Sequence, residues 1–336
     1  MSGGDNQTGM RPLIAWLLGL HPDTPKTRAK QWILAGRVRV KGEILRKPHQ
    51  LIEDPRDQLE LMDRRSARLD CGSGWRIHPR VTLLYLDSSL AIVNKGPGVV
   101  SVPSRNTELS ALSILQDFLA GRLRPLDHRV VTKLPPAFRR LSLLPVHRLD
   151  QYTSGVFCMA CNPAAREHLI QQVRAHTMRR EYIAFVEGKP ASDTGTWRHL
   201  LSLSEDELRQ DVAAPGQISE SDTKTQEAIT YYELLKEYSV GPPDAFVTKL
   251  KLRLETGLRH QIRVQAAHSG LPLVGERKYH PGPRLIDFPR QALHAISLTL
   301  EHPEQAERTL TLNAALPKDL LKLEHTLLAK RNDEGT

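Results

Sequence analysis

The sequence lacks the features that would place the chain in a membrane or in a secreted class. It contains no run of about 18 uninterrupted apolar residues, so it offers no ordinary membrane-spanning helix. Its first ten residues are polar and glycine-rich, without the apolar stretch of a signal peptide. Only three cysteines occur, Cys71, Cys158 and Cys161, an odd number that cannot form a disulfide framework. We therefore predict a cytoplasmic protein that does not bind membranes.

A metal site has little support either. Cys158 and Cys161 form a C-x-x-C pair, but no second Cys or His pair stands around it at the spacing of zinc ligands. Buried thiols in a strand are the better interpretation of these two residues. We predict no metal site.

The composition that remains is that of a folded protein with a polyanionic partner. Apolar residues make up 40% of the 336 residues and charged residues 25%, so most of the chain can bury a core. The length favours a main body with one smaller unit. Lys and Arg outnumber Asp and Glu by 47 to 38, a net charge of +9 that suits nucleic acid.

Residues 11–63 have the pattern of a small helix and sheet unit with one basic face. A helix is expected over residues 28–35, ended by Gly36. Residues 37–40 alternate apolar and cationic side chains as a strand with one packed face, and Lys41-Gly42 is expected to form the turn after it. This segment resembles the S-four-like RNA-binding domain, named after a ribosomal small-subunit protein. The resemblance implies RNA contacts by its cations, which are Arg28, Lys30, Arg37, Arg39, Lys41 and Lys47. An ordinary charged helix and hairpin is the alternative.

The rest of the chain is expected to be a linker, residues 64–80, and a larger body, residues 81–325. The body should begin with a hairpin in residues 81–95, because two apolar runs flank the turn residues at 87–89. Helical spacing follows over residues 108–119 and about 163–176, and the proline-bearing, basic stretch 122–140 has the composition of an insertion.

The segment "PVHRLDQYTSGV", residues 145–156, carries the candidate chemistry. Asp150 is expected on a loop just before a strand, a position where a scaffold fixes a side chain while leaving it accessible. The segment matches the His-Arg-Leu-Asp-x-x-Thr-Ser-Gly signature, so the chain resembles the RluA-type RNA pseudouridine synthases. A salt-bridged surface loop is the alternative.

Two further segments match the same family. "RREYIAFVEG", expected as a strand buried on both faces, places Tyr182 where the family has its aromatic residue. "ETGLRHQIRVQAAHSGLPLVGERKY" contains the pattern Gly-x-x-His-Gln-Ile-Arg and is expected to place His260 and Arg263 on one face of a helix. Two departures appear: Leu258 stands where Arg is usual, with Arg259 next to it as a partial replacement, and Glu276 stands where Asp is usual.

The resemblance implies a fold, an activity and a set of site residues. The fold is α+β, the pseudouridine synthase fold with a mixed, mainly antiparallel central sheet flanked by helices and loops, plus the small α/β N-terminal domain. The activity is isomerisation of specific uridines in structured RNA without a cofactor, by a monomer, with large-subunit ribosomal RNA favoured over transfer RNA.

Asp150 would be the catalytic carboxylate, Arg263 the cation that keeps it ionised and Tyr182 the ring that packs on uracil. Arg148 would fill the space left by the extruded base, and His147 would support the loop. The expected substrate-binding residues are Arg148, His147, Ile262, His260, Gln261 and Arg259.

Three other functions compete with this one. A non-catalytic RNA-binding or ribosome-assembly factor that retains the fold is favoured only by Leu258. A carboxylate glycosidase needs a second catalytic acid, which no other motif supplies. A metalloenzyme built on His147, His260 and His268 has the weakest support.

Overall fold

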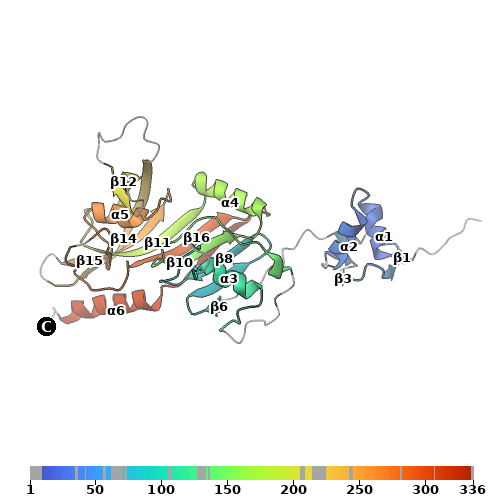
Figure 1. Ribbon diagram of the computed structural model, residues 1–336, viewed down its shortest axis with the longest axis horizontal. Helices are drawn as coiled ribbons and strands as arrows, with labels where there is room; N and C mark the ends of the chain where they lie inside the picture. The colour runs from blue at the N-terminus through green and yellow to red at the C-terminus, as the bar shows by residue number, and fades with distance from the viewer. Residues whose placement is uncertain are drawn as a thin grey trace, which may run out of the picture. The chain divides into compact units, whose positions relative to one another are not determined.

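The structure is a computed structural model, and the chain divides into two compact units, Met1–Arg68 and Leu69–Thr336. The residues that it describes are 10–34, 37–41, 43–55, 58–61, 71, 74–104, 108–126, 134, 137–204, 209–213, 225–241, 245–280, 282–305 and 307–333. Each unit is considered by itself (Figure 1). No helix in these ranges is long and apolar enough to cross a bilayer.

The N-terminal unit packs two helices against short strands. The elements are β1 (Arg11–Pro12), α1 (Leu13–Leu20), α2 (Lys26–Leu34), β2 (Val38–Val40), β3 (Glu43–Leu45), β4 (Leu51–Ile52) and β5 (Leu59–Leu61). β2 is the middle strand of three, in the order β3-β2-β5, and β1 pairs with β4. The buried residues of both helices and of β2 form one apolar cluster.

The sequence pattern located α2 and β2 to within two residues, but α1 was not predicted. In β2, Val38 and Val40 are buried on either side of the half-buried Arg39, as the alternation indicated. Lys41 has φ 51°, in the left-handed region that the expected turn requires. Gly36 and Gly42, expected to end the helix and to complete the turn, lie outside the described residues.

The larger unit is built on one 12-stranded sheet with helices beside it (Figure 1). Its strands are β6 (Trp75–His78), β7 (Val81–Leu86), β8 (Leu90–Lys95), β9 (Leu144–Pro145), β10 (Ser154–Ala160), β11 (Arg179–Glu187), β12 (Thr194–Leu203), β13 (Gln210–Val212), β14 (Gln226–Ser239), β15 (Phe246–Leu254), β16 (Leu293–Glu301) and β17 (Thr309–Asn313). Its helices are α3 (Ala111–Leu119), the 3₁₀ turn η1 (Phe138–Arg140), α4 (Pro163–Arg174), α5 (Gln261–His268) and α6 (Lys318–Asp333).

The sheet is mixed and mainly antiparallel, so the predicted fold class is confirmed. Its strand order is β13-β12-β14-β15-β11-β16-β10-β8-β7-β6, with β9 on β10 and β17 on β16. Among the described strand pairs only β10 and β16 run parallel, through two paired positions at Ser154 and Gly155. This short junction lies directly after the Asp150 loop.

Local sequence sets the helix ends. Ser110 caps α3 in a reciprocal pair of hydrogen bonds with Ser113, so the helix begins at Ala111 rather than at 108, and Leu109 is left 55% exposed. Asn162 caps α4 by accepting a hydrogen bond from the Ala165 N–H, and Pro163 occupies the first helical position.

Three expected boundaries are corrected. Residues 75–80 are not linker, because β6 hydrogen-bonds to β7 and Ile77 is fully buried. In the expected insertion, residues 127–133 and 135–136 lie outside the described part, but Phe138 is buried in the main core. The body does not end at 325, since α6 continues to Asp333 and buries Leu327.

The two cysteines of the C-x-x-C pair are buried free thiols, as predicted. Cys158 lies within β10, and burial raises the pKa of its thiol to about 12. Cys161 follows the strand and is 3% exposed. Both thiols are therefore protonated and packed at neutral pH, and neither is a reactive group.

Candidate active site

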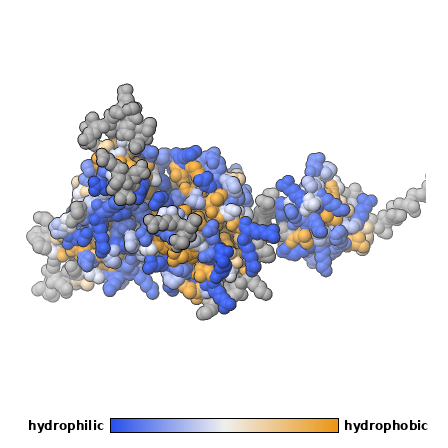
Figure 2. Space-filling model, in the orientation of Figure 1, coloured by the Kyte–Doolittle hydropathy of each residue, from blue (hydrophilic) through white to orange (hydrophobic). Residues whose placement is uncertain are grey.

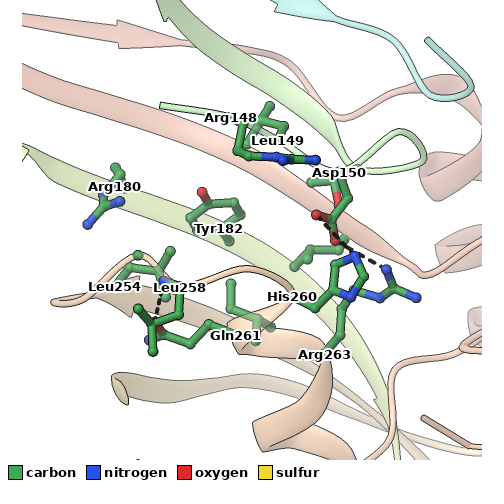
Figure 3. Close-up of a pocket in the computed structure, with 14 residues that line it drawn as sticks. Arg148, Leu149, Asp150, Arg180, Tyr182, Leu254, Leu258, His260, Gln261 and Arg263 are labelled. Carbon is green, nitrogen blue, oxygen red and sulfur yellow. Dashed lines mark hydrogen bonds and ion pairs between the residues drawn. The ribbon is translucent and has the colours of Figure 1, made fainter. Parts of the chain in front are cut away.

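Asp150, Tyr182 and Arg263 come from three separate elements and line one hollow (Figure 3). Asp150 is on the loop before β10, Tyr182 is on β11 and Arg263 is in the first turn of α5. The hollow has an empty volume of about 440 Å³, including space open to solvent. Its lining residues are Arg148, Leu149, Asp150, Thr153, Arg180, Tyr182, Leu254, Gly257, Leu258, His260, Gln261, Ile262, Arg263 and Leu293.

The loop that carries Asp150 is held against β16. The Thr153 N–H donates to the Asp150 carbonyl at 3.1 Å, which closes a turn. Gly155 then has φ 119°, and a Cβ there would lie 2.2 Å from the Ala295 carbonyl oxygen. Only glycine fits this backbone conformation and this contact, which explains the Thr-Ser-Gly ending of the motif.

Arg263 binds two carboxylates at once. Its Nη1 donates to Asp150 Oδ2 at 3.2 Å, while Nε and Nη2 donate to the two oxygens of Glu276 at 2.8 Å each. Glu276, the departure from the usual Asp, is 1% exposed and also accepts a hydrogen bond from the Lys278 N–H at 2.8 Å. The longer side chain thus makes a bidentate pair that fixes the guanidinium.

The ion pair between Arg263 and Glu276 keeps both side chains charged. Burial alone would lower the pKa of Arg263 and raise that of Glu276, but the charge and hydrogen bonds of each partner reverse both shifts. The pKa of Arg263 is therefore raised and that of Glu276 is lowered. Asp150 consequently faces a permanent cation.

His260 also approaches Asp150, but as a neutral ring. Its Nε2 is 3.8 Å from Asp150 Oδ1, and burial lowers its pKa to about 4 although the Asp150 charge opposes this. Its Nδ1 lies 2.8 Å from the Tyr279 hydroxyl, which accepts a hydrogen bond from the Gln210 N–H. Because the Tyr279 hydroxyl accepts from Gln210, its own proton can be donated to His260 Nδ1. The neutral His260 ring then carries its proton on Nε2, the nitrogen nearer to Asp150.

His260 was expected on the first turn of the helix, but it lies just outside it. It is the residue before α5 and has φ 53°. Its side chain still reaches the same carboxylate as Arg263, so the two residues converge on Asp150 from a loop and a helix.

Tyr182 forms the middle of the hollow. It is 6% exposed, and in Figure 3 its ring lies between Asp150 and Arg180. Burial raises the pKa of its phenol, with the Asp150 charge adding to the effect and the Arg180 charge opposing it. The phenol is protonated at neutral pH.

Three expected substrate-binding residues either have their polar groups engaged within the protein or lie outside the hollow. His147 Nε2 accepts a hydrogen bond from the Cys158 N–H at 3.1 Å, and burial lowers its pKa to about 3, so it supports the loop as a neutral ring. Gln261 donates to the Ile229 carbonyl at 3.0 Å and accepts from the Leu258 N–H at 3.0 Å, which engages both ends of its amide within the protein. Arg259 lines a larger groove beside the hollow rather than the hollow itself.

The remaining expected residues lie where they can meet a ligand. Arg148 and Ile262 line the hollow, and Arg148 is exposed. Leu258 lines it too, and it packs against an apolar cluster formed by Leu201, Ala228 and Val264. The usual Arg at this position is therefore replaced by a residue with a packing role.

Two buried basic residues that the sequence did not reveal hold the Asp150 loop, and burial lowers the pKa of one of them, Lys95, to about 7. Lys95 Nζ donates to the carbonyls of Gln151, Gly96 and Val99 at 3.1, 3.2 and 2.9 Å, and Arg290 Nη1 donates to the Tyr152 carbonyl at 3.0 Å. The one available signal was a lysine ending the apolar run of β8. Nothing in the local sequence marked Arg290.

No group of three or more His, Cys, Asp or Glu side chains is arranged to hold a metal ion in the described ranges. The side chains of the hollow offer a carboxylate, guanidinium groups, a phenol and apolar walls.

Comparison with known proteins assigns the family. Residues 89–268 match the RNA pseudouridylate synthase family, so the chain belongs to this family and is an RNA pseudouridine synthase, an isomerase. The ribosomal large subunit pseudouridine synthase D of Yersinia pestis is 29% identical over 339 residues, covering 97% of this chain and 93% of that protein. The protein of the same name from Escherichia coli K12 is 29% identical over 335 residues, covering 95% and 91%.

A solved structure supports the fold. The human RNA pseudouridylate synthase domain containing 4 superposes with a TM-score of 0.55 at 20% identity, covering 73% of this chain and 92% of that one.

Glu276→Gln is expected to lower the free energy of unfolding by about 3 kcal/mol, because it leaves a buried guanidinium with a neutral partner. Urea denaturation at neutral pH measures this. The control is Glu237→Gln, which removes a half-exposed pair with Lys189 and should cost less than about 1 kcal/mol. Equal losses in the two variants would contradict the role given to the Glu276 pair.

The same comparison made at lower pH tests the direction of the Glu276 pKa shift. A carboxylate whose folded-state pKa is depressed stabilises the fold above its unfolded pKa, and this contribution is lost as the pH falls through the folded value. The difference in unfolding free energy between wild type and Glu276→Gln should be constant near neutrality and shrink below about pH 4.5. A difference that grows on acidification would show that the sign is wrong.

Proposed function

We propose that Asp150 is the catalytic carboxylate that converts a uridine of structured RNA to pseudouridine, with Arg263 and Tyr182 as its partners. The observation that carries the proposal is the shared hollow, in which Asp150 is 3.2 Å from Arg263 and Tyr182 forms the adjacent wall. Residues far apart in the chain therefore converge on one hollow.

The reaction breaks the bond between ribose carbon 1′ and uracil nitrogen 1, turns the base and joins carbon 1′ to carbon 5. Nitrogen 1 ends with a proton and carbon 5 loses one, so the reaction is an isomerisation. An ionised carboxylate is needed either at the anomeric carbon or poised to take the proton beside it. Arg263 keeps Asp150 in that form, because it is a cation held in place by a second carboxylate.

Tyr182 acts as the platform for the base. Its buried ring supplies a flat apolar surface, and Ile262 lines the same hollow. Because the pKa of the phenol is raised, Tyr182 begins the reaction as a hydrogen-bond donor and can take the carbon 5 proton only after giving up its own.

Arg148 fills the place of the extruded base. A stacked uridine cannot reach a hollow of this kind, so the nucleotide leaves the stack and a side chain occupies the vacated space. Arg148 is exposed at the rim, two residues from Asp150.

The N-terminal unit binds RNA as an S-four-like domain. Four of the six expected cations, Arg28, Lys30, Lys41 and Lys47, are exposed. Arg37 and Arg28 lie 5.1 and 5.8 Å from the centre of the Trp32 ring, while Arg39 is 3.7 Å from Glu60. Hydrophilic residues cover most of the face of this unit seen in Figure 2. Such a face suits a phosphate backbone.

Ribosomal RNA of the large subunit is the substrate favoured here. The relatives whose names give a substrate act on the large ribosomal subunit, and they match this chain over nearly its full length. A basic N-terminal unit adds sequence-independent affinity for such a folded RNA.

Asp150→Asn is expected to lower the rate of pseudouridine formation by about 10²-fold to 10⁴-fold, because a neutral isostere replaces an ionised carboxylate. Release of tritium from RNA labelled at uridine carbon 5 measures the rate, and sequencing of treated ribosomal RNA maps the product. The control is Asp193→Asn at an exposed turn. Wild-type activity in Asp150→Asn would remove this residue from the mechanism.

Replacing Arg28, Lys30, Lys41 and Lys47 together by Gln is expected to weaken RNA binding and to flatten its salt dependence. Each lost phosphate contact should reduce the slope of log K against log salt by about 0.7 to 0.9. Filter binding at several salt concentrations measures the slope. The control is Lys318→Gln with Lys322→Gln on the exposed side of α6. An equal change in this control would contradict a specific role for the N-terminal unit.

A further inference from the structure

Arg180 is a buried cation in the wall of the hollow with no role in the mechanism above. It is 6% exposed, lies two residues before Tyr182 on β11 and pairs in register with Leu254 of β15. Arg180, Tyr182 and Leu254 all line the hollow. In Figure 3, Tyr182 separates Arg180 from Asp150.

The charge of Arg180 has no carboxylate partner in the described part of the chain. Its Nη2 donates to two main-chain carbonyls, that of Glu255 at 3.3 Å and that of Thr256 at 3.2 Å. Its Nε is buried and has no hydrogen-bond acceptor among the residues that the structure describes. Burial lowers the pKa of the guanidinium, and the nearby Tyr182 opposes this only in part. An unpaired charge at such a place is costly, whereas a bound anion would offset the cost.

The chain also keeps room for this guanidinium. A Cβ on Gly257 would lie 2.3 Å from Arg180 Nη1, so any larger residue at 257 would displace it. Gly257 lies in the turn that leads to His260 and α5. The turn thus brings main-chain carbonyls to one edge of the guanidinium and leaves the cation at the hollow.

We propose that Arg180 binds a phosphodiester that flanks the target uridine. A guanidinium matches the geometry of phosphate oxygens, and the uracil ring itself carries no negative charge that would require a cation. Along the strand, Arg180 and Tyr182 lie about 7 Å apart on one face, so a base on the phenol brings its own backbone to this side of the hollow. The inference rests on the proposed function, because it assumes that the uridine occupies this hollow.

Neutral phosphates test the assignment. Synthetic stem-loop RNAs around the mapped uridine would carry a methylphosphonate either 5′ or 3′ of it, and dissociation constants would be measured for wild type and Arg180→Gln. In wild type, one of the two substitutions should weaken binding by about 10-fold or more, the size of a charge-assisted contact. Arg180→Gln should lose a similar factor on unmodified RNA and should not respond to that substitution.

Arg179→Gln is the matched control, since Arg179 is the exposed neighbour on the same strand. It should keep the wild-type response to the methylphosphonate. Arg180→Lys retains the charge without the fork and should keep part of the response, which provides a second reading if Arg180→Gln folds poorly by circular dichroism.

Two results would overturn the assignment: wild type binding both methylphosphonate RNAs as well as the unmodified RNA, or additive losses in Arg180→Gln. Turnover of the unmodified RNA by wild type, measured in parallel, separates the two levels. Absence of pseudouridine would defeat the proposed function, whereas turnover without coupling would defeat only the role of Arg180.

Discussion

One guanidinium shared between two carboxylates organises this site. The Nε and Nη2 of Arg263 donate hydrogen bonds to the buried Glu276, and its Nη1 donates to Asp150 in the hollow. An arginine held by only one acid could swing away from Asp150, whereas a bidentate pair fixes the plane of the guanidinium. Asp150 is therefore paired with a cation whose position does not depend on it.

The scaffold brings these groups together through contacts that are remote in sequence. Asp150 is held by its own turn, by Gly155 against Ala295, and by hydrogen bonds from Lys95 and Arg290 to the carbonyls of the two residues that follow it. Arg290 in turn donates to Asp319 of α6 at 2.7 Å. The loop is thus tied to the first hairpin, to β16 and to the last helix. A reacting group needs such support, because small displacements cost much of its rate.

The sequence predicted the elements that carry a local pattern. The motif at 145–156, the two-sided strand around Tyr182 and the segment before Arg263 all have spacing that indicates their structure, and these three residues do share one hollow. What could not be predicted depends on partners elsewhere in the fold. The roles of Lys95, Arg290 and Arg180 depend on main-chain carbonyls that the fold brings to them from other segments. Gln261 matches the motif, but its amide is hydrogen-bonded within the protein. β6 has too short a pattern to distinguish a strand from a linker.

The hollow is electrically divided, and the division has a chemical meaning. At one end Arg263 faces two carboxylates, Asp150 and Glu276, and His260 is neutral, so this end carries a net charge of about −1. At the other end Arg180 has no acid beside it in the described ranges, and the protonated Tyr182 lies between the two ends. A neutral molecule would leave Arg180 uncompensated, and a free anion would be repelled by Asp150. A nucleotide joins a neutral base to an anionic backbone, and its two parts fit the two ends in one orientation only. For the uridine proposed to occupy this hollow, the arrangement of charge sets the direction of entry before any bond is broken.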